Sequence, residues 1–216
     1  QSELFGPYRG RSMAIGYWFN IGLKSAVIAS VNADGTVHLV EGSTDIGGTR
    51  TTIAMQFAET LGLSATDIYP SVGDTSAIGY TDVTGGSRVT YATGWAAYEA
   101  AEDVKRQMIE RATILWEVAP GQVEYVDGIF RTIDGLREST FRDLAGKLED
   151  TGGPVVGRAT VHPDTGVGGS FAANIVDVEV DPETGKVTIL RFTVIQDAGK
   201  AIHPSYVEGQ MQGGSV

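Results

Sequence analysis

The sequence predicts an α+β fold of mixed sheets, built from hairpins, with packed helices. Turn residues rich in Asn, Asp and Gly stand at 32–35, 127–128 and 181–185, each between two runs typical of β-strands. Two other segments carry apolar residues at helical spacing. Strands and helices do not alternate regularly along the chain, which disfavours a parallel βαβ architecture.

The first predicted elements are a hairpin and a helix. Residues 25–42 form two β-rich runs around the first turn signal. After them, Ile53, Phe57 and Leu61 are spaced four apart and share one face of a helix. Gly62 follows this face directly and is expected to end the helix.

A short strand is expected at residues 67–75, and a long helix from about Thr90 onward. The first half of this helix is Ala and Gly nearly all round, which predicts burial, and its second half is amphipathic, which predicts a position at the surface. The large and apolar residues at helical spacing are Trp95, Tyr98, Ala101, Val104 and Met108.

The last part of the chain is rich in predicted strands. A second hairpin is expected at residues 121–133, and Ser139 and Thr140 are candidate caps of a following helix. Residues 174–197 alternate apolar and polar side chains on both sides of the third turn signal, which predicts a third hairpin.

Composition restricts the class of protein. The chain has 216 residues, of which 42% are hydrophobic and 20% charged, as expected for a soluble globular protein. Its 27 acidic and 16 basic residues give a net charge of −11, which disfavours nucleic acid and anionic membranes as partners. No apolar run reaches the roughly 20 residues of a membrane span, and no leader is evident, so a cytoplasmic location is expected.

The chemistry of the chain is restricted by the absence of cysteine, which excludes disulfides, thiol nucleophiles and cysteine-ligated metal within the chain. The chain begins at Gln1 without a methionine and stops shortly after QMQGG. We therefore expect it to be an excised piece of a longer protein.

Two glycine pairs, Gly47-Gly48 and Gly85-Gly86, precede the two predicted helices. The N-terminus of a helix has unpaired N–H groups and a partial positive charge, and glycine lets an anion approach them closely. Hydroxyl groups and an arginine follow each pair: Thr49, Arg50 and Thr51 in the first case, Ser87 and Arg88 in the second. Glycine pairs are also common in ordinary turns, so both interpretations stay open at this point.

Other candidate sites are weaker. Residues 165–170, TGVGGS, have the glycine spacing of a dinucleotide loop but no helix after them, and are interpreted as a flexible loop. His38, His162 and His203 are far apart in the sequence, so no metal site is predicted. No Gly-x-Ser-x-Gly motif occurs either, and no catalytic residue is assigned.

Two further sets of polar residues have ordinary explanations. The carboxylate pairs Glu41 with Asp45 and Asp177 with Glu179 lie on predicted hairpins and are interpreted as a solvated face. Gln210 stands near several glycines, where an amide could recognise the edge of a heterocycle, and the alternative is a helix start with surface glutamines.

Three segments in order resemble the motifs of a known family: EGSTDIGGTRTTIAMQFAETLG at residues 41–62, VGDTSAIGYTDVTGGSRVTYATGWAAYEAA at 72–101, and VIQDAGKAIHPSYVEGQMQGG at 194–214. They are similar to motifs of the xanthine dehydrogenase and aldehyde oxidase family of molybdenum hydroxylases. Residues 9–22, RGRSMAIGYWFNIG, also resemble the family's segment just before them. The resemblance covers nearly the whole chain.

The resemblance implies that residues 1–216 are a fragment of the molybdenum-cofactor-binding region, of the xanthine dehydrogenase type, with a subdivision into lobes expected near 118–160. The cofactor would be molybdopterin or molybdopterin cytosine dinucleotide, carrying molybdenum. By the same resemblance, the residues that contact it are Ile46, Gly47, Gly48, Gly86, Ser87, Arg88, Val89 and Gln210. The two helix entrances would then be cradles for pterin and phosphate.

The family's reaction is hydroxylation of a carbon centre in an aldehyde, purine or N-heterocycle. Iron–sulfur clusters and FAD on other domains or subunits accept the electrons, so the implied partners are those parts, the rest of the molybdenum subunit and a small-molecule substrate, with no nucleic acid and no membrane. The family's glutamate base would lie beyond Val216. The isolated chain is therefore expected to be inactive and free of molybdenum.

One position departs from the family pattern, since most members have glutamine where this chain has Gly48. Two alternatives to an oxidoreductase fragment also remain. One is a non-catalytic module that binds a nucleotide or phosphate through the same loops, and the other is a structural or assembly domain.

Overall fold

The computed structural model describes residues 6–163 and 168–215. The chain divides into two compact units, one formed by Gln1–Phe19 with Gly168–Val216 and the other by Asn20–Val167. The lobes expected near 118–160 would be a finer division inside the second unit and stay a prediction. Among the helices of the described residues, none combines the length and apolar character needed to cross a membrane.

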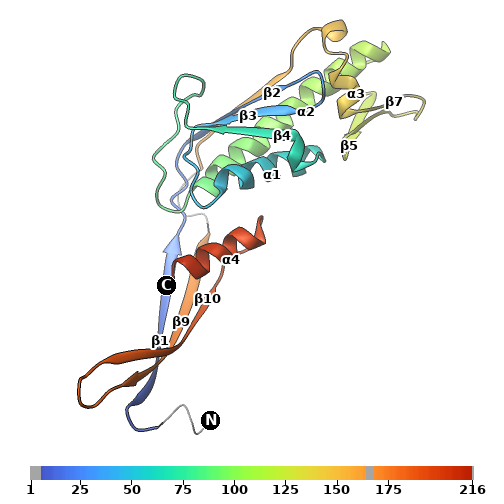
Figure 1. The fold of residues 1–216 in the computed structure, drawn as a ribbon. Coiled ribbons are helices and arrows are strands. Elements are labelled where there is room, and N and C mark those ends of the chain that lie inside the picture. The colour runs from blue at the N-terminus through green and yellow to red at the C-terminus, as the bar shows by residue number, and fades with distance from the viewer. Residues whose placement is uncertain (1–5, 164–167, 216) are drawn as a thin grey trace. The chain divides into compact units, whose positions relative to one another are not determined.

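The second unit contains a four-stranded sheet in the order β4-β3-β2-β8, with two helices on one of its faces (Figure 1). These elements are β2 (Ser25–Val31), β3 (Val37–Glu41), α1 (Thr49–Leu61), β4 (Ile68–Val72), the π-helix η3 (Val89–Thr93), α2 (Gly94–Trp116) and β8 (Val156–Val161). β2 pairs antiparallel with β3 and β8, whereas β3 and β4 are parallel. The hairpin at 25–42 and the strand at 67–75 are confirmed.

A smaller sheet, in the order β5-β6-β7, completes the second unit. The remaining elements of this unit are η2 (Ala65–Asp67), β5 (Val123–Val126), β6 (Ile129–Thr132), β7 (Glu138–Thr140), α3 (Phe141–Ala145) and η4 (Glu149–Thr151). The second predicted hairpin is confirmed as β5 and β6. Thr140 caps α3, because its hydroxyl accepts the N–H of Asp143 at 3.0 Å.

The core of the second unit lies between the large sheet and α1 and α2. Ile53, Phe57 and Leu61 of α1 are all fully buried, as their spacing predicts. Gly62 ends α1 in the left-handed conformation, with φ 60°, and its N–H bonds the carbonyls of Ala58 and Glu59. The spacing of its apolar residues and the terminating Gly62 together therefore determine where α1 lies in the sequence.

Burial in the first turns of α2 differs from the prediction. Trp95 and Tyr98 are 39% and 48% exposed, and the buried stripe consists of Ala96, Ala97, Ala100, Ala101, Val104, Met108, Ala112 and Trp116. A Cβ built on Gly157 of β8 would lie 2.4 Å from the carbonyl oxygen of Ala100. Because helix and strand approach so closely, only small side chains fit between them, and Trp95 and Tyr98 turn outward.

The first unit is a three-stranded antiparallel sheet in the order β1-β9-β10, followed by a helix. Its elements are β1 (Arg9–Phe19), β9 (Gly169–Val180), β10 (Val187–Gln196) and α4 (Pro204–Gly213). The third predicted hairpin is confirmed as β9 and β10. Residues 165–167 of the predicted flexible loop lie outside the described residues, and Gly169 and Ser170 already belong to β9.

An ion pair on this sheet corrects one expectation. Asp177 is buried, with 3% of its surface exposed, and accepts two bonds from the Arg11 guanidinium at 2.6 and 2.9 Å. These bonds hold the pKa of Asp177 below its ordinary value. Asp177 is therefore a paired, buried carboxylate, and the prediction of a solvated face is wrong for it.

Candidate functional site

The two glycine loops lie next to each other at one end of the second unit. The first loop, residues 42–48, joins β3 to α1, and the second loop, residues 82–88, leads into η3 (Figure 1). The N–H of Thr44 donates to Thr84 Oγ1 at 3.3 Å, and Ser43 Oγ lies 2.6 Å from Thr93 Oγ1. Segments about 40 residues apart in the sequence are thus joined by direct contacts, as one shared site would require.

The first loop reaches α1 through two glycines in the left-handed region. Gly47 has φ 61° and Gly48 has φ 81°, a backbone that other residues rarely adopt. Asp45 closes the turn, because its carboxylate accepts the N–H of Arg50 at 3.1 Å and lies 3.5 Å from Arg50 Nε. The N-terminus of α1 therefore already has an anionic partner from its own chain, and Ile46 beside it is 56% exposed.

The second loop contains two glycines in different surroundings. A Cβ built on Gly85 would meet no atom within 4 Å among the described residues. Gly86 has φ 70°, and a Cβ there would lie 2.5 Å from Ile21 Cγ2. The fold itself therefore requires Gly86, and Gly85 is the position where a side chain would enter open space. Ser87, which follows, also has positive φ, at 55°.

Arg88 is fully buried and holds the base of the second loop. A guanidinium has five N–H donors. They donate to the carbonyl oxygens of Gly22, Lys24, Asp82 and Val83 at 2.8, 2.6, 3.2 and 3.4 Å, and to the hydroxyl oxygen of Ser25. Desolvation lowers the pKa of Arg88 from its ordinary value. Its side chain has no donor left for a ligand, so any contact by Arg88 with a cofactor would use its main chain, and the same holds for the buried Val89.

A chain of buried hydroxyls ties the loops to the sheet. Ser25 Oγ lies 2.9 Å from Thr93 Oγ1, which lies 2.6 Å from Ser43 Oγ, and the Arg88 guanidinium joins this chain at Ser25. Sequence reasoning missed this network. No local pattern marks it, because its members come from β2, the first loop, the second loop and η3.

Glu41, the last residue of β3, is also buried, with 1% of its surface exposed. It shares a sheet face with Val37 and Leu39, which pack in the core. Burial and the nearby Asp45 raise the pKa of Glu41 to about 8, and Arg50 offsets this only in part. The prediction of a solvated face is therefore wrong for Glu41, since strand alternation directs its side chain inward.

Gln210, the remaining predicted contact, lies on α4 in the first unit and is exposed. The predicted helix start in this segment is confirmed, with Pro204 at the first helical position. Gln210 stays a prediction as a cofactor contact. Within the described part of the chain, no group of three or more His, Asp or Glu residues could hold a metal ion.

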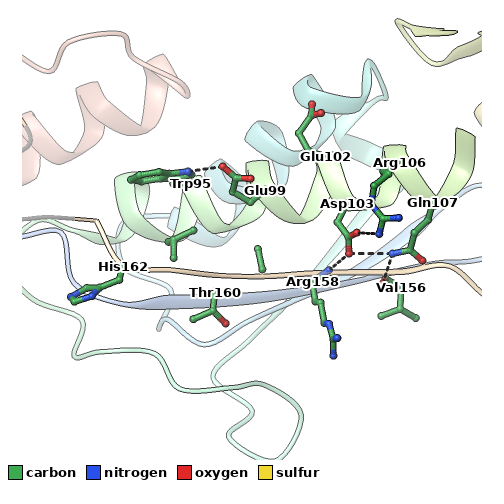
Figure 2. A pocket seen from close by; sticks show the side chains of 12 residues that line it. Trp95, Glu99, Glu102, Asp103, Arg106, Gln107, Val156, Arg158, Thr160 and His162 are labelled. Atoms are coloured by element: carbon green, nitrogen blue, oxygen red, sulfur yellow. Dashed lines mark hydrogen bonds and ion pairs between the residues drawn. The ribbon is translucent and has the colours of Figure 1, made fainter. Parts of the chain in front are cut away.

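A groove of about 1000 Å³ lies between α2 and β8 (Figure 2). Asp103 Oδ2 accepts the N–H of Arg158 at 3.1 Å, and Gln107 Nε2 donates to the carbonyl of Val156 at 2.9 Å, so these side chains cap the edge of β8. Trp95, with its indole N–H on Glu99, forms another part of the wall. None of the predicted cofactor contacts lines this groove.

Comparison with known proteins gives a consistent result. A family model described as "Molybdopterin cofactor-binding domain" matches residues 5–216. The xanthine dehydrogenase molybdenum-binding subunit of Escherichia coli O157:H7 is 28% identical over 191 residues, covering 85% of this chain and 25% of that protein. The carbon monoxide dehydrogenase large chain of Afipia carboxidovorans is 31% identical over 176 residues, covering 77% and 21%. The chain thus spans about a quarter of the length of these relatives.

Solved structures agree on the fold. The chain is similar to a Cu,Mo-CO dehydrogenase, with a TM-score of 0.83, 24% identity, and coverage of 96% of this chain and 28% of that one. It is also similar to quinoline 2-oxidoreductase from Pseudomonas putida 86, with a TM-score of 0.80, 21% identity, and coverage of 96% and 29%. These matches confirm the predicted α+β fold, with hairpin sheets and packed helices.

Proposed function

The chain belongs to the molybdopterin cofactor-binding domain family, and we propose that it forms part of the cofactor site of a molybdenum hydroxylase. The observation that supports this most is the direct contact of the first loop with the second loop, from Thr44 to Thr84, and with the helix that follows it, from Ser43 to Thr93 of η3. Both loops present main chain at the beginning of a helix, where N–H groups lack intrahelical acceptors.

The residues present fit a large polar cofactor. Gly85 borders open space, so a ligand could approach the main chain of the second loop closely. Arg88 places a buried positive charge beneath that loop, although its N–H groups are already bonded. The Asp45 carboxylate at the start of α1 would repel an anion, so we assign the phosphate of the cofactor to the second loop.

When bound, the molybdenum cofactor would supply the oxidation of a carbon centre in an aldehyde, purine or N-heterocycle. The proposed share of this chain is to hold and orient the cofactor through the main chain of Gly47, Gly48 and residues 86–89, with Ile46 beside them. A contact from Gln210 stays a prediction of the family resemblance. Iron–sulfur and FAD partners, the catalytic base and the substrate pocket would lie in other parts of the full protein. A cytoplasmic location belongs to the same proposal.

Substitution of Gly85 tests this function in the full-length protein purified with its partner subunits. We expect Gly85→Val to lower molybdenum per folded protein at least tenfold without lowering the melting temperature, because the side chain enters open space. Gly10→Val on β1 is the matched control, since a Cβ there also meets no described atom within 4 Å, and it should load normally.

A normal molybdenum content in Gly85→Val would refute the proposal that the second loop holds the cofactor. The alternative of a nucleotide- or phosphate-binding module predicts something different. In that case the wild-type protein would contain neither molybdenum nor pterin, measured by elemental analysis and by fluorescence of the oxidised pterin.

A further inference from the structure

Glu41 ends β3 directly before the first loop, and one oxygen of its carboxyl group is buried without a partner. Its Oε2 is buried and forms no hydrogen bond with any residue of 6–163 or 168–215. The residues opposite it in the sheet are Val27 on β2 and Val72 on β4, whose side chains cannot hydrogen-bond a carboxyl group. A buried polar atom without a partner is costly and calls for an explanation.

Two charged side chains act on Glu41. Asp45, on the first loop, is a second negative charge and raises its pKa, and Arg50, on the first turn of α1, is a positive charge that lowers it. Arg50 is engaged with Asp45, which accepts its main-chain N–H at 3.1 Å and lies 3.5 Å from its Nε. The five donors of Arg88, on the second loop, already end on the acceptors described above, so this guanidinium is not available to Glu41. Glu41 is therefore compatible with this arrangement only as a neutral acid.

We propose that Glu41 is a positioning residue: while it is protonated the first loop stays closed, and its ionisation draws Arg50 away from Asp45 and releases the first turn of α1. In this step the Oε–H bond of Glu41 breaks and the proton passes to water. The carboxylate that remains needs a cation, and Arg50 already acts on it. No other covalent bond changes.

The consequence follows from what Asp45 does in the closed form. Its carboxylate caps α1 at the N–H of Arg50, one residue after Thr49. When Arg50 turns to Glu41, Asp45 loses half of this two-point contact, and Gly47 and Gly48 are free to move because glycine strains little in either conformation. The consequence for the cofactor rests on the proposed function: the open loop should bind the cofactor less tightly than the closed loop does.

Hydrogen exchange in the full-length protein tests the switch without reference to the cofactor. The amides of residues 44–52 are followed from pH 6 to 9 in the wild type and in Glu41→Gln, whose amide cannot ionise. Intrinsic exchange rates are the same in both at a given pH, so the ratio of protection reports the switch alone. We expect equal pH dependence below pH 7 and about tenfold lower protection in the wild type at pH 9, because the ratio of ionised to neutral acid rises about tenfold per pH unit.

Two further variants sharpen the outcome. Glu99→Gln removes an exposed glutamate of α2 and should behave as the wild type. Asp45→Asn removes the competitor for Arg50, so the loop should open at a lower pH, and this variant serves if Glu41→Gln does not fold. The same pH profile in Glu41→Gln as in the wild type, or an unmoved midpoint in Asp45→Asn, would overturn the proposal.

Molybdenum retention separates this proposal from the proposed function. After dialysis, the wild type should retain less molybdenum at pH 9 than at pH 6, and Glu41→Gln should retain the same amount at both. Loop opening at high pH with unchanged molybdenum would support the switch and would count against the first loop as a cofactor contact.

Discussion

Replacing Glu41 with glutamine should make the second unit more stable, and increasingly so as the pH rises. Glu41 is 1% exposed, and the pKa of its carboxyl group lies at about 8 in the folded protein, against an ordinary value of 4.5. Between these values the unfolded chain has released the proton while the folded protein still holds it. Stability is therefore complete below pH 4.5, falls as the pH rises, and levels off above pH 8.

The magnitude follows from these two pKa values. Each pH unit between them costs about 1.4 kcal/mol, so the wild type loses roughly 3 kcal/mol by pH 7 and roughly 5 kcal/mol above pH 8. A buried glutamine has a desolvation cost of its own, on the order of 1–3 kcal/mol, which reduces the gain at any single pH. It does not titrate, however, so the slope against pH is unaffected.

Native-state hydrogen exchange of α1, residues 53–61, is the appropriate assay, since these core amides exchange through unfolding of their surroundings. From pH 5 to 8, protection in Glu41→Gln relative to the wild type should increase by about tenfold per pH unit. The local opening described above concerns the amides of residues 44–52 and sets in above pH 7, so the two effects are followed on different amides. A protection ratio that stays constant from pH 5 to 8 would refute the burial argument.

Three other substitutions test the packing of the second unit, the first two by thermal or chemical unfolding and the third by proteolysis. Arg88→Gln should lose about 3 kcal/mol or more, because buried carbonyls lose their donors; a stable variant that fails only to bind cofactor would contradict this. Gly86→Ala should lose about 1–3 kcal/mol, because φ is 70° and Ile21 is too close. Adding Ile21→Ala to the Gly86→Ala variant should relieve the steric clash but not the backbone strain from the positive φ. Gly157→Val should separate β8 from α2 and expose α2 to proteolysis, and an unchanged cleavage rate would contradict the close contact at Ala100.

The sequence by itself determined the elements whose signals are local. The hairpins around residues 32–35, 127–128 and 181–185 follow from turn residues that favour positive φ, and α1 follows from its apolar face and the terminator Gly62. The family and the general position of the glycine loops were also predictable. Three ordered motifs carry that information without any knowledge of contacts.

Tertiary structure alone decided which side chains are available to a ligand. The sequence offered Arg88 as an anion-binding arginine, but the fold engages its donors with carbonyls of its own loop and of a segment more than 60 residues away. Position 86 requires glycine because Ile21 leaves no room for a side chain there, and no local sequence pattern reveals this contact.

The same holds for burial. Trp95 and Tyr98 point outward because Gly157 brings β8 against α2, and Glu41 is buried because its strand directs it toward the helices. Turn and helix propensities depend on neighbours in the chain, whereas solvation and hydrogen-bond satisfaction depend on neighbours in space.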